Sequence, residues 1–174
     1  MNGSDWYEEA VGKHHDRDAF DCGDANLNEF LRKHARQSHE AGGAKTFLAI
    51  ARRDRRVIGF YSVCPASLHY EATPALARKK LARHDVPVFR LARLGVDRTV
   101  QGQVLGGQLL LAAGRRCLRV AAEVGGVGLL IDAKNSRAAA WYASYGALPL
   151  EDTPYTLVLP FGVLQKALGE AGLL

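Results

Sequence analysis

A glycine-rich segment, Gln101–Gly107, separates a strand-like run from a helix-like run. Side chains alternate over residues 91–97, which predicts a strand. Over residues 105–123 apolar side chains recur every three or four positions, which predicts a helix. Glycine lets the backbone turn tightly, and the first turn of a helix presents unpaired N–H groups and the positive end of its dipole. The pattern therefore predicts an anion site at this segment, with an ordinary turn as the alternative.

A second strand and helix follow along the chain. Residues 127–132 are short and apolar, as in a buried parallel strand, and residues 133–146 predict a helix. We expect this helix to be capped near Asn135 or Ser136 and to end at Gly146. Its aromatic residues recur at helical spacing, which by itself is typical of core packing. They are Trp141, Tyr142 and Tyr145.

Both segments, in this order and spacing, resemble the GNAT acetyltransferase superfamily. In that family a strand ending in Val-Asp leads to Gln or Arg, two residues, Gly, one residue, and then Gly or Ala. Without gaps, Val96 and Asp97 match the strand end, and Gln101 and Gly106 match the first and last motif positions. Val104 stands where the family has its middle glycine. A valine keeps its backbone N–H but loses access to positive φ and adds bulk, which predicts weaker cofactor binding.

The resemblance implies a fold and a cosubstrate. The fold is a mixed α/β sheet with helices on both faces and a splayed pair of parallel strands that form the cleft for acetyl-CoA. The resemblance also implies that Tyr142 lies beside the coenzyme sulfur and is the general acid for the leaving thiolate. Because a tyrosine has a pKa near ~10 and a thiol near ~8.5, a hydrogen bond to the thiolate is the alternative to full proton transfer. The residues that the resemblance assigns to acetyl-CoA are Leu94, Gly95, Val96, Gln101, Gly102, Gln103, Val104, Leu105, Gly106, Gly107 and Asn135.

The N-terminal half narrows the resemblance to the GNAT toxins of type II toxin-antitoxin modules. Those proteins combine a Phe-x-Cys-Gly start, a Leu-Asn/Asp-x-Phe-Leu helix, a hairpin ending in Gly-Tyr/Phe-Tyr, and a Leu-x-Arg-Leu-x-Val-Asp strand. The chain has all four, within residues 20–31, 45–63 and 91–97. The toxins acetylate the α-amino group of aminoacyl-tRNA. The resemblance therefore implies that substrate, a small antitoxin as a partner, and a homodimer.

Composition is consistent with a single domain over residues 1–174, because a chain of this length with 48% hydrophobic residues can bury a full core. No apolar run reaches the ~18 residues that span a bilayer, and the N-terminus lacks the apolar stretch of a signal peptide. We therefore expect a cytoplasmic protein with no membrane partner. Three widely spaced cysteines, and no Cys/His/Asp cluster with ligand spacing, predict neither disulfides nor a metal. These cysteines are Cys22, Cys64 and Cys117.

The net charge of +5 indicates an acidic partner, for which coenzyme phosphates account in part. Four clusters of Arg and Lys occur along the chain, and a single cluster of this kind is usually just a solvent-exposed face. In the toxins the helix between the hairpin and the cofactor strand lines the acceptor side, so we expect RNA contact there, on a ten-residue helix that Pro74 opens. The residues expected to contact tRNA phosphates are Arg78, Lys79, Lys80, Arg83 and, on the cofactor strand, Arg93.

The sequence therefore predicts an acetyl-CoA-dependent N-acetyltransferase of the toxin type that acts on aminoacyl-tRNA. One alternative is a GNAT enzyme that acetylates a small amine or a protein amine. Another is a non-catalytic GNAT fold that binds nucleic acid or protein.

Overall fold

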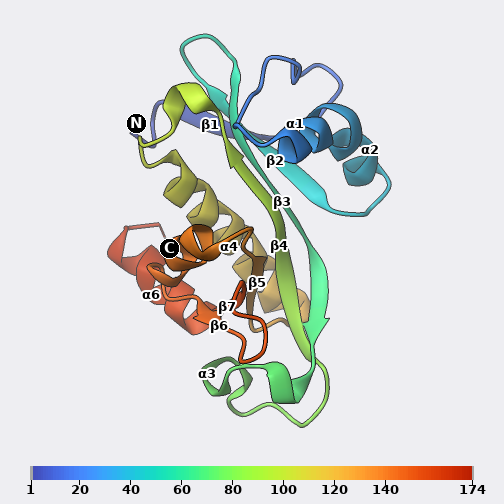
Figure 1. The fold of residues 1–174 in the computed structure, drawn as a ribbon, viewed down its shortest axis with the longest axis vertical. Helices are drawn as coiled ribbons and strands as arrows, with labels where there is room; N and C mark the ends of the chain where they lie inside the picture. Colours follow the sequence, from blue (N-terminus) through green and yellow to red (C-terminus); the bar gives the residue numbers. More distant parts are fainter. Residues whose placement is uncertain (1, 174) are drawn as a thin grey trace. The chain divides into compact units, whose positions relative to one another are not determined.

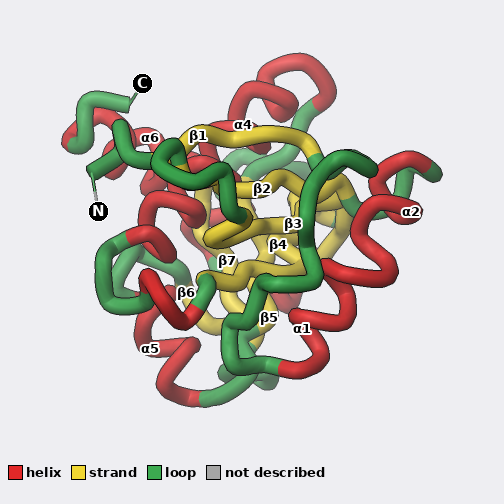
Figure 2. The backbone as a smooth tube through the Cα atoms, turned by 90° about the horizontal axis from the view of Figure 1, so that it is seen from above, coloured by secondary structure: helices red, strands yellow, loops and turns green. Residues whose placement is uncertain are grey.

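The structure, a computed structural model, describes residues 2–173. Within these residues seven strands form one mixed sheet in the order β1-β2-β3-β4-β5-β7-β6, and helices are interspersed among the strands along the chain (Figures 1 and 2). This confirms the predicted mixed α/β class. The strands are β1 (Trp6–Ala10), β2 (Lys45–Ala51), β3 (Val57–Leu68), β4 (Val86–Val96), β5 (Gly128–Asp132), β6 (Leu148–Pro149) and β7 (Thr156–Pro160). The helices are α1 (Ala25–Glu29), η1 (Phe30–His34), α2 (Ala35–Glu40), η2 (Tyr70–Ala72), α3 (Ala75–Arg78), η3 (Arg98–Val100), α4 (Leu105–Val124), α5 (Ser136–Ala143) and α6 (Phe161–Glu170).

The described residues divide into two compact units. The first unit contains residues 2–64 and 92–113, and the second contains residues 65–91 and 114–173. The elements β3, β4 and α4 each continue from one unit into the other. The single domain expected over residues 1–174 stays a prediction. Within residues 2–173, no helix has the length and apolar character needed to cross a membrane.

The first unit contains the antiparallel strands β1 and β2 and the beginning of β3. Tyr7 pairs with Ile50 across the first two strands, and the hairpin expected within residues 45–63 is present as β2 and β3. Asp24 caps helix α1, because its carboxylate accepts hydrogen bonds from the backbone N–H groups of Asn26 and Leu27. The helices and strands of this unit bury an apolar cluster. It comprises Val11, Phe20, Phe30, Leu31, Ala35, Leu48, Ile50, Val57 and Phe60.

The second unit is built around β5, which pairs in parallel with β4 and antiparallel with β7. In the parallel register Phe89 lies opposite Leu129 and Leu91 opposite Ile131. Four of the five β5 residues are buried, which confirms the buried parallel strand predicted at residues 127–132. A separate apolar cluster lies in this unit. It comprises Ala77, Val86, Val88, Leu130, Leu150 and Val158.

The prediction of a ten-residue helix that Pro74 opens is wrong, because α3 has only four residues and ends at Arg78. Lys79 is not helical, with a ψ of 129°, and Lys80 has a left-handed φ of +66°. Leu81 packs against the apolar cluster of the second unit, and this tertiary contact overrides the helix propensity of the local sequence. The basic residues of this region therefore do not share one helix.

Candidate active site

The segment Gln101–Gly107 lies in the first unit and leads from β4, through the short helix η3, into α4. Asp97 precedes it, and its carboxylate accepts hydrogen bonds from the N–H and hydroxyl of Thr99, at 3.0 and 2.7 Å, and from the N–H of Asp21 at 3.0 Å. Burial by itself would raise the pKa of Asp97, but these hydrogen bonds and the nearby charge of Arg56 lower it. The ionised carboxylate therefore fixes the start of the loop.

Two residues of this loop have left-handed backbone, since φ is +75° at Gly102 and +63° at Val104. The expectation that valine loses this conformation is wrong, because Val104 adopts it. A β-branched residue in this region is an outlier that costs on the order of 1–2 kcal/mol. The Val104 side chain is 66% exposed, while its carbonyl accepts the hydrogen bond of Gln108 N at the start of α4. Backbone geometry, and not side-chain packing, therefore accounts for the conformation of Val104.

The side chain of Gln101 is held by the protein itself. Its Nε2 donates to the carbonyl oxygen of Val96 at 2.9 Å and to that of Cys22 at 3.0 Å. Gln101, expected to bind the cofactor directly, thus joins the strand end to the N-terminal segment. The loop backbone is the part suited to face a ligand, because the first N–H groups of any α-helix have no intrahelical partner, and in α4 they belong to Leu105, Gly106 and Gly107.

The end of β4 packs tightly on aromatic rings of the first unit. A Cβ at Gly95 would lie 3.0 Å from Cε1 of Phe60, so glycine permits the close approach of this ring. Leu94 and Val96, on either side, are partly buried. The guanidinium carbon of Arg93 lies 3.7 Å from the centroid of the Phe30 ring, and burial lowers the pKa of this arginine. One flat face of the Arg93 guanidinium is thus covered by an aromatic ring.

Helix α5 in the second unit carries the predicted tyrosine. The side chain of Asn135 caps this helix by accepting a hydrogen bond from the N–H of Ala138 at 2.8 Å, as expected. Gly146 follows the helix with a φ of +97°, and a Cβ there would lie 2.5 Å from Cγ1 of Val163. A side chain is therefore excluded at Gly146 by conformation and by space.

Tyr142 lies on α5 next to a second aromatic residue. Its ring centroid is 4.8 Å from that of Trp141 in an edge-to-face arrangement, and Trp141 also contacts Tyr145 at 5.2 Å. Burial raises the pKa of Tyr142 to about 12. Its hydroxyl therefore stays protonated near neutral pH and is available as a hydrogen-bond donor.

Four of the five cations expected to contact RNA, all except Arg93, lie in the second unit and differ in their surroundings. Arg78 stacks on Tyr70, with its guanidinium carbon 4.6 Å from the ring centroid, and donates to the Tyr70 carbonyl at 3.0 Å. Arg83 lies 5.6 Å from the same ring centroid. Lys79 and Lys80 are exposed. Arg78 thus packs on Tyr70, whereas Arg83 is 77% exposed and also lies 3.7 Å from the Glu71 carboxylate. The two lysines project into solvent.

A potential metal-ligand group occurs in the first unit, although the sequence predicted none. Glu9, His14 and His15 bring their ligand atoms within 4.8 Å of one another. The N–H of Gly12 donates to Nδ1 of His15 at 2.9 Å, and Nε2 of His15 lies 2.6 Å from the Glu9 carboxylate. A neutral ring that accepts at Nδ1 carries its proton on Nε2, so this nitrogen has no lone pair for a metal. The arrangement fits a hydrogen-bonded histidine and carboxylate, which also lowers the pKa of Glu9.

Sequence reasoning missed the part played by Asp97 and by the arginines after β2. Asp97 was recognised only as the strand end of a motif, yet its carboxylate joins residues that are distant in the chain. Its carboxylate is also 3.8 Å from Nη2 of Arg56. The sequence does contain a signal for this role, because an aspartate directly after an apolar strand often accepts a hydrogen bond from the backbone N–H two positions later, here that of Thr99.

No family model matches the chain. The chain is similar to the tRNA-acetylating toxin of Mycobacterium tuberculosis, with 36% identity over 127 residues that cover 73% of this chain and 75% of that protein. A solved structure of AtaT complexed with acetyl-methionyl-tRNAfMet has a TM-score of 0.86 at 28% identity, covering 94% of this chain and 99% of that one. A variant of the AtaT toxin bound to the C-terminus of the antitoxin AtaR and acetyl-CoA has a TM-score of 0.78 at 26% identity, covering 94% and 98%.

Proposed function

Because this chain belongs to the family of GNAT toxins that acetylate tRNA, we propose that it transfers the acetyl group of acetyl-CoA to the α-amino group of an aminoacyl-tRNA. The observation that carries the proposal is the backbone of the loop before α4, where Gly102 and Val104 are both left-handed. These two residues lie within the segment that matches the family motif, and Val104 takes a left-handed conformation at the position of the middle glycine. The enzyme uses acetyl-CoA as its cosubstrate.

We assign the binding of acetyl-CoA to the residues named from the sequence, with Gln101 acting indirectly by bracing the loop backbone. The N–H groups from Gly102 to Gly107, at the positive end of α4, are suited to a pyrophosphate. The paired register of β4 and β5 covers Phe89–Leu91, and β4 continues to Val96. We propose that Leu94, Gly95 and Val96 contact the pantetheine arm of acetyl-CoA, and that Asn135, which precedes α5, also contacts the cofactor.

Acetyl transfer to an α-amino group requires few catalytic groups from the protein. An α-amino group has a pKa of ~7.7–8.0, so a useful fraction is neutral near pH 7 and attacks the thioester without a strong base. The N–H groups near Val96 are proposed to stabilise the oxyanion that forms. Tyr142 is proposed to assist the departing thiolate. With its pKa raised to about 12, it donates a hydrogen bond and does not give up its proton, because a thiol has a pKa near ~8.5.

We propose that tRNA phosphates are contacted by Lys79 and Lys80 and, where their stacked positions allow, by Arg78, Arg83 and Arg93. A small antitoxin is the proposed partner and inhibitor, since AtaT binds the C-terminus of AtaR. We further propose a homodimer that acts in the cytoplasm, where charged tRNA is found.

The test is a transfer assay with labelled acetyl-CoA and a panel of aminoacyl-tRNAs. We expect label on the α-amino group of at least one species, released as the N-acetyl amino acid after the ester is hydrolysed. Label on a small amine or a protein amine, with none on tRNA, would favour the other GNAT activities. Binding of acetyl-CoA without transfer to any acceptor would favour a non-catalytic fold.

A further inference from the structure

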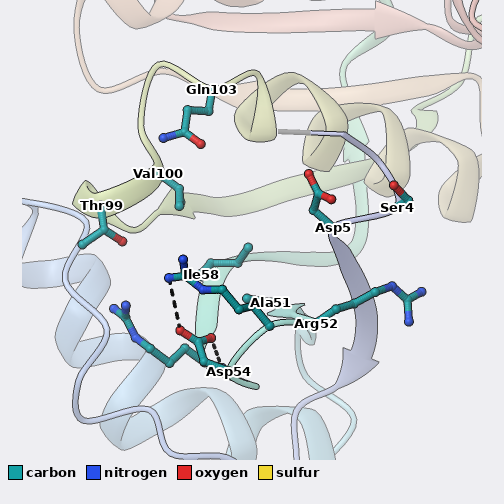
Figure 3. A pocket seen from close by; sticks show the side chains of 11 residues that line it. Ser4, Asp5, Ala51, Arg52, Asp54, Ile58, Thr99, Val100 and Gln103 are labelled. Atoms are coloured by element: carbon teal, nitrogen blue, oxygen red, sulfur yellow. Dashed lines mark hydrogen bonds and ion pairs between the residues drawn. The ribbon is translucent and has the colours of Figure 1, made fainter.

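The turn between β2 and β3 reads Arg-Arg-Asp-Arg-Arg at residues 52–56 and borders a cavity of about 730 Å³ in the first unit. Figure 3 shows this cavity with Gln103 on one side and Arg52 and Asp54 on the other. Pockets of about 300–1,000 Å³ bind small molecules, so the volume suits a ligand of nucleotide size. Its lining includes Arg52, Arg53 and Arg56 from the turn, and Thr99, Val100 and Gln103 from the segment before α4.

One side of the cavity is lined by Thr99, Val100 and Gln103, and Gln103 belongs to the proposed coenzyme loop, residues 101–107. The N–H of Asp97 donates to the carbonyl oxygen of Ile58 at 2.9 Å, which joins the end of β4 to the beginning of β3. Arg56 reaches the same aspartate, with Nη2 3.8 Å from its Oδ1. Because this carboxylate also caps η3, it holds the arginine turn next to the loop that is proposed to bind pyrophosphate.

The arginines at the cavity retain donors for an anion. Nη2 of Arg53 is 3.7 Å from the Asp54 carboxylate, and its side chain is 90% exposed. Arg52 stacks over the Tyr7 ring at 5.2 Å, and within residues 2–173 no carboxylate lies at ion-pair distance from it. The cavity's three arginines outnumber its two carboxylates, Asp5 and Asp54. A guanidinium presents its N–H groups as a planar fork that matches phosphate oxygens, so the cavity is suited to a phosphate monoester.

We propose that this cavity binds the phosphorylated ribose at the nucleotide end of the acyl donor, with Arg52 and Arg53 contacting its 3′-phosphate. The proposal rests on the proposed function, because it takes acetyl-CoA as the ligand of the neighbouring loop. A ligand held at its pyrophosphate by the loop has its 3′-phosphate at the nucleotide end, and the arginine cavity shares Gln103 with that loop. The arginine turn thereby makes the enzyme selective for coenzyme A over its dephosphorylated form.

The experiment compares coenzyme A with 3′-dephospho-coenzyme A by calorimetry, with no acceptor present. The wild-type protein should bind coenzyme A about tenfold more tightly, the scale of a charge-assisted contact. In the double variant Arg52→Ala/Arg53→Ala the two ligands should bind about equally. Arg119→Ala, an exposed arginine on α4 that does not line the cavity, is the matched control and should keep the wild-type ratio. Arg56→Gln gives a third measurement, with thermal unfolding recorded because Arg56 also pairs with Asp97.

Equal binding of the two ligands by the wild-type protein, or an undiminished ratio in the double variant, would overturn the proposal. Loss of aminoacyl-tRNA binding by the double variant with its ligand ratio intact would also overturn it, and would assign the arginines to RNA phosphates. Failure of the proposed function would give a different result, namely no acetyl transfer by the wild-type protein. The ratio of the affinities for coenzyme A and its dephosphorylated form is measured without acetyl transfer, so the two outcomes are distinguishable.

Discussion

The side-chain amide of Gln101 donates a hydrogen bond to the carbonyl oxygen of Val96 at 2.9 Å, across the turn that joins β4 to the coenzyme loop. The same nitrogen donates to the carbonyl oxygen of Cys22 at 3.0 Å. Three segments thus meet at one side chain. The first residue of the motif acts here as a brace for the loop backbone, and the backbone is the part proposed to contact phosphate.

Gln101→Ala should therefore weaken acetyl-CoA binding without abolishing catalysis. Both hydrogen bonds of an exposed side chain are lost, so we expect a loss of about 1 kcal/mol in the free energy of unfolding. Acetyl-CoA affinity should fall by about three- to tenfold, with turnover at saturation near normal. Chemical denaturation, calorimetry and steady-state kinetics measure the three quantities. Gln165→Ala, an exposed glutamine on α6, is the control, and equal behaviour of the two variants would refute the bracing role.

Val104→Gly should stabilise the protein. The substitution removes a strain on the order of 1–2 kcal/mol at a φ of +63°, while the flexible glycine adds about 0.4–1 kcal/mol of unfolded-state entropy, so the net gain is about 0.5–1 kcal/mol. Acetyl-CoA affinity should be unchanged or tighter, because the backbone N–H groups are retained. Val104→Ala trims the exposed side chain but keeps a Cβ in the left-handed region, so it should gain less. A lower unfolding free energy for the glycine variant, or loss of acetyl-CoA binding, would contradict this account.

Local patterns in the sequence predicted much of the frame around the site. The Asn135 cap, the buried strand at residues 127–132 and the turn before α4 all depend on residues close together in the chain. Caps and turns are local interactions, which is why side-chain type and spacing are enough to locate them.

The features that were missed depend on residues far apart in sequence. Leu81 lies outside α3 and packs against an apolar cluster instead of continuing the predicted helix. Periodicity in the sequence reports helix propensity and cannot show that a tertiary contact outweighs it. Asp97 accepts a hydrogen bond from the N–H of Asp21, 76 positions away. The cavity beside Arg52 likewise forms only when the β2–β3 turn meets the coenzyme loop. In each case the tertiary fold creates the contact.

Tyr142→Phe should lower turnover by about a hundredfold, the scale of a lost catalytic proton or hydrogen-bond donor. The ring and its contact with Trp141 are kept, so the free energy of unfolding and the affinity for acetyl-CoA should barely change. Turnover at saturating substrates and thermal unfolding test both statements. Tyr145→Phe removes a hydroxyl from the turn that follows α5 and should retain wild-type turnover. Near-normal turnover of the Tyr142 variant would assign that residue to core packing.

The raised pKa of Tyr142 also predicts a pH dependence of stability. Burial raises this pKa from 10.0 to about 12, so the folded protein holds the phenolic proton more tightly than the unfolded chain. The resulting stabilisation is fully present below about pH 10 and is lost as the pH rises toward 12. The unfolding free energy of the wild type should therefore fall relative to that of Tyr142→Phe over this range. A constant difference between the two proteins would show that Tyr142 is not buried in solution.

Replacement of Lys79 and Lys80 tests the proposed tRNA contact more cleanly than replacement of the neighbouring arginines, because Arg78 and Arg83 also stack on Tyr70. Lys79→Ala/Lys80→Gly removes two exposed charges, and glycine suits the φ of +66° at residue 80. Each lost phosphate contact should reduce the slope of log affinity against log salt by roughly 0.7–0.9, so the double variant should lose about 1.5.

The matched control for the lysine pair is Arg119→Ala/Lys166→Ala, which removes the same charge from exposed positions on α4 and α6. Any effect of net charge alone should appear equally in both double variants. A specific contact should change the slope only in the Lys79/Lys80 variant, with acetyl-CoA affinity intact in each, because that ligand is assigned to the loop before α4. Filter binding of aminoacyl-tRNA across a salt series measures the slopes. If the two double variants give the same slope, Lys79 and Lys80 belong to a solvated face and the acceptor stem binds elsewhere.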